Sequence, residues 1–151
     1  MTRNKKNSPT GASKEGFREI LEASSDAIVT AGEDGSISFW NNAAEKMFGY
    51  TPEEAIGLGV IDLVPEEYRK RHTSGFRNFI RTGKGKLIGK PAIVKAVRKD
   101  GTVFPVELSI SGSRHGGRWL LAAIIRDITG RRSFEHKLAH QSRLLSKANQ
   151  E

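Results

Sequence analysis

The second half of the chain contains three consecutive segments with strand character, joined by two short turn sequences that contain glycine. Asp-Gly and Gly-Gly connections of this length are typical of hairpins between antiparallel strands, whereas parallel strands need a crossover of a dozen or more residues. The sequence therefore predicts three sequential antiparallel strands in one sheet. The strands are Leu87–Arg98, Thr102–Ser113 and Trp119–Asp127, and the turns are Lys99-Asp100-Gly101 and His115-Gly116-Gly117.

The hydrophobic patterns of the last two segments differ. In Thr102–Ser113, apolar residues from Phe104 to Ile110 alternate with polar ones, as expected for an antiparallel strand with one face on the core. In Trp119–Asp127 every residue before Arg126 is apolar. This pattern predicts that the last strand is covered on both faces and lies at the centre of the sheet.

The first half adds two strands and several helices. Ala27–Ala31 and Ser36–Trp40 flank a turn, and a longer helix is expected at about Glu66–Arg81. Shorter helical segments lie between them, one begins near Ser13, and one runs from about residue 130 to the end. We expect an α+β domain at residues 13–129 with helices over one sheet face, after a disordered leader at residues 1–12 and before a linker helix at residues 130–151.

Composition narrows the function. The 151 residues carry a net charge of +8, of which residues 1–16 and 130–151 contribute +3 each, leaving 8 − 3 − 3 = +2 for residues 17–129. Since DNA-recognition domains cluster basic residues on a folded face, this distribution argues against specific nucleic-acid binding. The absence of cysteine excludes a disulfide, a thiolate metal site and a cysteinyl–flavin adduct. No segment has the ~20 apolar residues of a membrane span, so a cytoplasmic protein is expected.

His72 is the main candidate for binding chemistry. On the predicted long helix it lies one turn from both Tyr68 and Phe76, on the apolar face. An imidazole directed into an apolar pocket can ligate a metal or haem iron, or it can be a neutral core histidine bonded to a carbonyl group or a water. The predicted pocket is lined by this helix and by the sheet residues Ile88, Leu108, Ile110 and Ile125.

Three stretches of the chain resemble the PAS sensor-domain family. They are FREILEASSDAIVTAGEDGSISFWNNAAEKMFGYTPEEAIG, VRKDGTVFPVELSIS and AIIRDITGRR, and the resemblance extends from about Phe17 to Arg132. It implies a five-stranded antiparallel sheet in the order 2-1-5-4-3, which also places the wholly apolar strand in the centre. It further implies a sensory, non-catalytic module that controls a kinase, cyclase or other output domain through its C-terminal helix.

The segment PEEYRKRHTSGFRNF looks like the haem-ligand helix of rhizobial oxygen-sensor PAS domains. That likeness implies His72 as the iron ligand and Lys86 as a partner of a haem propionate. Two positions depart from the pattern, because Asn78 and Ala92 stand where those sensors have basic residues. Non-covalent flavin or an apolar ligand are alternatives, and a flavin would use Trp40, Asn41 and Asn42, unless the asparagines cap the following helix. A cofactor-free dimerisation adaptor is a further alternative.

The junction between the last strand and the last helix is expected to transmit the signal to the output domain. The resemblance implies that Asp127 or Thr129 holds the start of the last helix against the sheet, a role compatible with simple capping. Large apolar side chains lie on both flanking helices, and we expect them to pair in a homodimer that continues into an output domain. They are Phe17, Ile20 and Leu21 on the first helix, and Phe134, Leu138 and Leu145 on the last.

Overall fold

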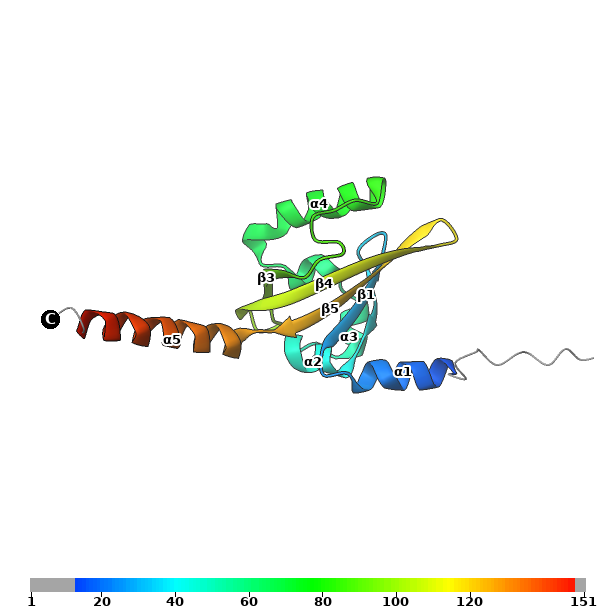
Figure 1. Cartoon of the computed structure of the whole chain (residues 1–151). Coiled ribbons are helices and arrows are strands. Elements are labelled where there is room, and N and C mark those ends of the chain that lie inside the picture. The colour runs from blue at the N-terminus through cyan, green and yellow to red at the C-terminus, as the bar shows by residue number, and fades with distance from the viewer. Residues whose placement is uncertain (1–12, 149–151) are drawn as a thin grey trace, which may run out of the picture.

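In the computed structural model, residues 13–148 are described, except for the side chains of residues 131–136 and 146–148. The leader at residues 1–12 and the side chain of Phe134 lie outside this part. The elements follow in the order shown in Figure 1. They are α1 (Lys14–Ala23), β1 (Ala27–Gly32), β2 (Ile37–Trp40), α2 (Asn42–Phe48), α3 (Pro52–Ile56), the 3-10 turns η1 (Val60–Leu63) and η2 (Glu66–Tyr68), α4 (Arg69–Thr82), β3 (Ala92–Val97), β4 (Val103–His115), β5 (Arg118–Asp127) and α5 (Thr129–Ala148).

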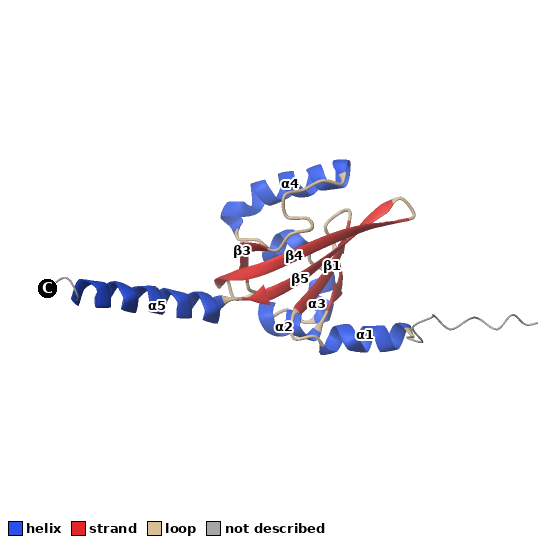
Figure 2. Ribbon diagram, viewed as in Figure 1, coloured by secondary structure: helices blue, strands red, loops and turns tan. Residues whose placement is uncertain are grey.

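The five strands form one antiparallel sheet in the order β2-β1-β5-β4-β3 (Figure 2). In the register, Ala123 of β5 lies opposite Val29 of β1 and Ile110 of β4, and Leu108 lies opposite Ile125. Both predicted hairpin turns form, with positive φ angles at their glycines. The α+β fold and the predicted strand order are therefore confirmed.

The core lies between the inner face of the sheet and the short helices α2 and α3. Phe48 of α2 is buried between two aromatic rings, 5.4 Å from that of Trp40 and 5.7 Å from that of Phe104 between centroids. Helix α3 begins with a capping box in which Thr51 and Glu54 satisfy each other's backbone N–H groups. Helices α2 and α3 therefore pack on one end of the inner face, and α4 packs near the other end.

Two boundaries differ from the predictions. Strand β3 begins at Ala92 rather than Leu87, since Gly89 has a φ of +84° and Pro91 has no N–H to donate to a strand ladder. The long helix begins at Arg69, because residues 66–68 form the 3-10 turn η2. Its C-terminus is close to the predicted position, with Gly83 as a left-handed cap.

The prediction that β5 is covered on both faces is wrong. The strand does lie at the centre of the sheet, and Leu121 and Ile125 are buried on its inner face. On its outer face, however, Leu120 is 37% exposed and Ile124 is 49% exposed. The described helices leave this part of the outer face open. The continuous apolar sequence of β5 therefore forms one buried face and one exposed apolar face.

The flanking helices join the sheet at the same end, where Ala27 of β1 lies opposite Ile125 of β5, but they run in opposite directions, α1 to the lower right and α5 to the left (Figure 1). Helix α1 is capped by Ser13, whose side chain accepts a hydrogen bond from the backbone N–H of Gly16 at 3.0 Å. Its apolar side chains face solvent, with Phe17 57% and Ile20 66% exposed, and on α5 Leu145 is 67% exposed. None of the described helices is both long and apolar enough to cross a membrane.

Candidate functional site

Helix α4 is anchored to the sheet near the β4–β5 hairpin. Phe79 is buried, and its ring centroid lies 4.7 Å from that of Trp119 on β5. The ring passes over Gly112 of β4, where an added Cβ would lie 2.8 Å from Phe79 and 3.2 Å from Leu121. The absence of a side chain at position 112 therefore allows the close approach of α4 to the sheet.

Gly112→Ala is expected to lower the free energy of unfolding by about 1–3 kcal/mol, because Phe79 and Leu121 must move to accommodate the methyl group. It should also change the fluorescence of Trp119. The matched control is Gly75→Ala on the exposed side of α4, where a Cβ meets nothing within 4 Å. Since alanine favours a helix over glycine by about 1 kcal/mol, the control should be neutral or stabilising. Equal stability of the two variants would contradict this account of how α4 is anchored.

His72 lies two turns from Phe79 along α4, on the side of the helix that faces the domain. Its side chain is partly buried, and its ring stacks on Phe76 with 6.0 Å between centroids and 26° between planes. Burial lowers the pKa of His72 below its usual value. The imidazole is consequently neutral at pH 7, and a neutral ring nitrogen is the form that ligates a metal.

The other predicted lining residues surround a part of the sheet that the helices cover incompletely. Leu108 and Ile110 are only partly buried, although Phe104 and Val106 before them on β4 are fully enclosed. On β5, Ala123 is partly exposed, although Leu121 and Ile125 on either side of it on the inner face are buried. Tyr68, Phe76 and Ile88 are also partly buried, and Ile88 forms an isolated bridge with Ile110. Ile125 is fully buried in the core and Lys86 is exposed.

Trp119 adds a polar group that the sequence did not single out. Its indole Nε1–H is buried and has no hydrogen-bond partner among the described residues. An unsatisfied buried donor costs about 1–3 kcal/mol. The hydrophobic pattern treated Trp119 only as a strand residue, and nothing in the local sequence indicates that its N–H is left without an acceptor.

The polar groups considered for flavin already have protein partners. The indole of Trp40 donates to the carbonyl oxygen of Tyr50 at 3.0 Å. Asn41 is fully buried and caps α2 by accepting from the backbone N–H of Ala44 at 3.0 Å, and Asn42 bonds to Glu22 on α1. The structure therefore supports the capping interpretation for Asn41, whereas Asn42 is the first residue of α2 and its side chain bonds to α1 instead.

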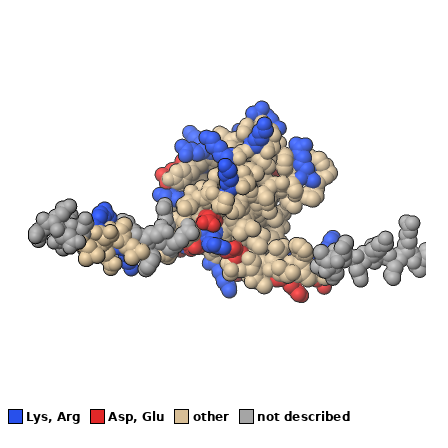
Figure 3. Space-filling view, in the orientation of Figure 1, with Lys and Arg blue, Asp and Glu red and all other residues tan. Residues whose placement is uncertain are grey.

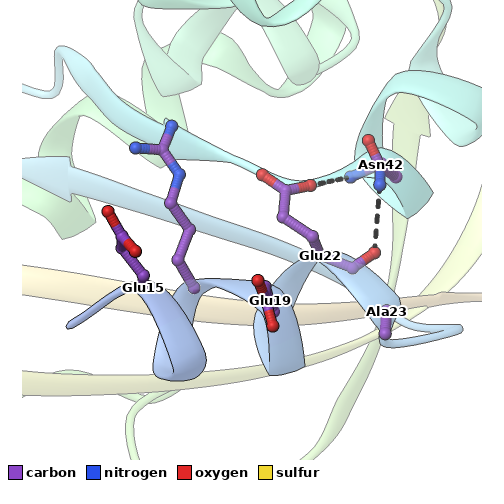
Figure 4. Close-up of a pocket in the computed structure, with 6 residues that line it drawn as sticks. Glu15, Glu19, Glu22, Ala23 and Asn42 are labelled. Atoms are coloured by element: carbon purple, nitrogen blue, oxygen red, sulfur yellow. Dashed lines mark hydrogen bonds between the residues drawn. The ribbon is translucent and has the colours of Figure 1, made fainter. Parts of the chain in front are cut away.

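A groove of about 470 Å³ lies elsewhere, between α1 and the start of α2 (Figure 4). It is open to solvent, and three carboxylates and one guanidinium line it. It is far from His72 in the fold and contains none of the predicted site residues. Its lining residues are Glu15, Arg18, Glu19, Glu22, Ala23 and Asn42.

Asp127 connects the end of β5 to the start of α5. Its carboxylate accepts hydrogen bonds from the backbone N–H and the hydroxyl of Thr129, and it pairs with Arg98 at 2.9 Å. Partial burial acts to raise the pKa of Asp127, but the bonds from Thr129 and Arg98 outweigh it and hold the pKa below its usual value. Arg98 also lies over the ring of Phe104 at 3.6 Å and donates to the carbonyl oxygen of Met47. The junction thus includes α2, which sequence reasoning did not predict.

Comparison with solved structures agrees with this architecture. The crystal structure of a PAS domain from Colwellia psychrerythraea matches with a TM-score of 0.65 at 24% sequence identity, covering 77% of this chain and 97% of that one.

Two curated relatives are sensors. The sensor protein FixL of Bradyrhizobium diazoefficiens is 36% identical over 135 residues, which is 85% of this chain and 27% of the relative. The oxygen sensor protein DosP of Escherichia coli K12 is 30% identical over 111 residues, which is 74% of this chain and 14% of the relative. The chain thus spans a small part of each relative's length. The family described as "PAS domain" matches residues 25–130. With the strand order, the helical cover and these relatives together, the chain belongs to the PAS domain family of sensory signal-transduction modules.

Proposed function

We propose that this PAS domain binds a small ligand between α4 and the inner face of the sheet, and that it relays binding to α5. The observation that carries the proposal is the partly uncovered centre of the inner face, where apolar residues of β4 and β5 stay accessible beneath a helix. A ligand placed there would bury this apolar surface, with a gain of roughly 25 cal/mol per Å². One with a suitably placed acceptor would also satisfy the N–H of Trp119.

Haem is the specific ligand that we propose for this site. His72 offers a neutral imidazole nitrogen on the side of α4 that faces the sheet, which is the donor type that haem iron takes. Lys86 is exposed and free to meet a propionate at the rim. Haem iron would supply reversible binding of a diatomic gas or a change of redox state. Ala92 provides no hydrogen-bond donor to a bound gas, so any selectivity would come from other residues or from the apolar surroundings.

His72→Ala tests this assignment. Wild-type protein titrated with haemin is expected to shift and sharpen the Soret band of haemin up to one equivalent, and the variant should leave the band as in free haemin while its circular dichroism stays unchanged. The matched control is His115→Ala, which removes an exposed imidazole on the β4–β5 hairpin. Haem binding by the His72 variant with an unchanged spectrum would mean that another residue ligates the iron. A wild-type protein that leaves the Soret band of free haemin unchanged would leave an apolar ligand as the candidate.

The relay would run through the Asp127 junction. Arg98, just after β3, and Thr129, at the start of α5, hold the carboxylate at the same time, so a shift of β5 beneath a ligand changes the contacts at the start of α5. The output would be a kinase or cyclase domain, as the resemblance to PAS sensor domains implies. We place the domain in the cytoplasm, because a chain without cysteine suits a reducing compartment.

We further propose that the domain acts as a homodimer. The exposed apolar side chains of α1 and α5 do not fold back onto their own sheet, and the outer face of β5 adds Leu120 and Ile124. Such surfaces are typical of interaction sites. A parallel dimer about a two-fold axis would cover the flanking helices and align both copies of α5 for output.

A further inference from the structure

The folded domain is electrically polarised. Residues 69–99 contain 11 basic residues and no acidic one, whereas residues 13–68 contain 12 acidic and 3 basic residues. Residues 100–129 are balanced at three of each. The sum, +11 − 9 + 0 = +2, is the small net charge that argued against a basic folded face. The total conceals a strongly basic segment that is contiguous in sequence.

In space, this segment forms a basic surface over α4. Figure 3 shows Lys and Arg side chains gathered on the side of the molecule where Figure 1 places α4. Lys70, Arg77 and Arg81 are spaced by seven and four residues and share one face of α4, and Phe79 lies two and a half turns from Lys70, on the opposite face. We define the α4 basic surface as the exposed residues Lys70, Arg71, Arg77, Arg81, Lys84, Lys86 and Lys90.

The charges of the α4 basic surface are not neutralised by the described part of the protein. Within residues 69–99, the ion pairs with described residues are those of Arg98 with Asp127 and of Lys99 with Glu54. The seven residues of the surface form none. Like charges so close together repel one another and weaken the folded state, and an anionic partner would remove this repulsion.

The chemistry of the surface favours a polyphosphate chain over a membrane or a protein. Every exposed residue of α4 is polar or glycine, so the helix has no apolar side chain to insert into a lipid layer or to form the core of a protein interface. Guanidinium groups suit phosphate, and the exposed hydroxyl of Ser74 adds a neutral hydrogen-bonding group next to them. The face from Lys70 to Arg81 is about 16 Å long, which is enough to lie along several consecutive phosphates of one strand.

We propose that the α4 basic surface binds the phosphate backbone of a nucleic acid strand without reading its sequence. The bases would face away from α4, because the surface has no exposed aromatic ring for stacking. Binding would release counterions and weaken steeply with salt. Lys70, Arg77 and Arg81 lie on the opposite face of α4 from His72 and take no part in the ligand site proposed above, although Lys86 at the edge of the surface is shared with it.

The test uses the full chain and a fluorescein-labelled single strand of about 20 nucleotides, as RNA and as DNA, followed by fluorescence anisotropy from about 50 to about 200 mM salt. The variant is Lys70→Gln/Arg77→Gln/Arg81→Gln. The matched control, Lys14→Gln/Arg18→Gln/Lys46→Gln, removes the same charge from exposed positions on α1 and α2. A third protein, Arg3→Gln/Lys5→Gln/Lys6→Gln, tests the N-terminal segment.

We expect the α4 variant to lose at least about tenfold in affinity and the slope of log K against log salt to fall by about 2, whereas both other proteins stay within about twofold of wild type. Equal losses in the α4 variant and the α1–α2 control would overturn the proposal, since net charge alone would then account for binding. So would a loss confined to the N-terminal variant, or no wild-type binding at about 50 mM salt. Tighter binding to phosphatidylserine vesicles than to either strand would instead assign the surface to a membrane.

Discussion

Asn41→Leu is expected to lower the free energy of unfolding by about 3–5 kcal/mol, a large part of the total stability of a domain of this size. The Asn41 side chain is fully buried and makes four hydrogen bonds. Its oxygen accepts from the N–H groups of Ile28 at 2.9 Å and Ala44 at 3.0 Å, and its amide donates to the carbonyl oxygens of Leu21 at 2.8 Å and Asp26 at 3.0 Å. Leucine satisfies none of these backbone groups, which belong to the α1–β1 region and to α2.

Urea denaturation followed by circular dichroism measures the effect. The matched control is Asn42→Leu at the neighbouring position, where the side chain is exposed and its amide donates to the carbonyl oxygen of Glu22 at 3.2 Å. Because solvent replaces that bond, the control should lose less than about 1 kcal/mol. A comparable loss in both variants would show that Asn41 contributes as an ordinary helix cap and does not join α1 to the sheet.

The elements set by local chemistry could be predicted from the sequence. The two hairpin turns depend on glycines at positions 101 and 116–117, all with positive φ. The capping box at Thr51 and the cap at Gly83 were likewise readable, because each uses residues within one or two turns. Such features need no knowledge of which distant residues meet.

The features that were missed depend on contacts between distant segments. Continuous apolar character on β5 does not reveal whether a second layer exists, and here the outer face has none in the described residues. The role of Arg98 arises from Asp127, 29 residues later, and from Met47, 51 residues earlier. The basic surface was missed for another reason. When the net charge is summed over the whole domain, the negative charge of residues 13–68 offsets most of the positive charge of residues 69–99.

The proposed homodimer rests on the exposed apolar side chains of the flanking helices. Ile20 on α1 and Leu145 on α5 are each about two-thirds exposed, and full burial of such a side chain gains roughly 1.5–3 kcal/mol. In a two-fold dimer each of these side chains occurs in both copies, so its burial contributes twice. Replacing both with aspartate would place four carboxylates in the interface, and the penalty of burying a charge adds to the lost apolar contact. We therefore expect Ile20→Asp/Leu145→Asp to weaken dimerisation by at least about a hundredfold.

Light scattering at micromolar concentration measures this directly, because the chain has a mass of 16.6 kDa and the dimer has twice that mass. The wild type is expected as a dimer and the double variant as a monomer with unchanged circular dichroism. Ile56→Asp is the control, since Ile56 is equally apolar and 51% exposed but lies on α3, away from the flanking helices. Dissociation by the Ile56 variant would move the interface to α3, and a monomeric wild type would refute the dimer. If the dimer forms as proposed, the two copies of α5 leave the sheets side by side, and a shift at Asp127 changes the register of both helices together.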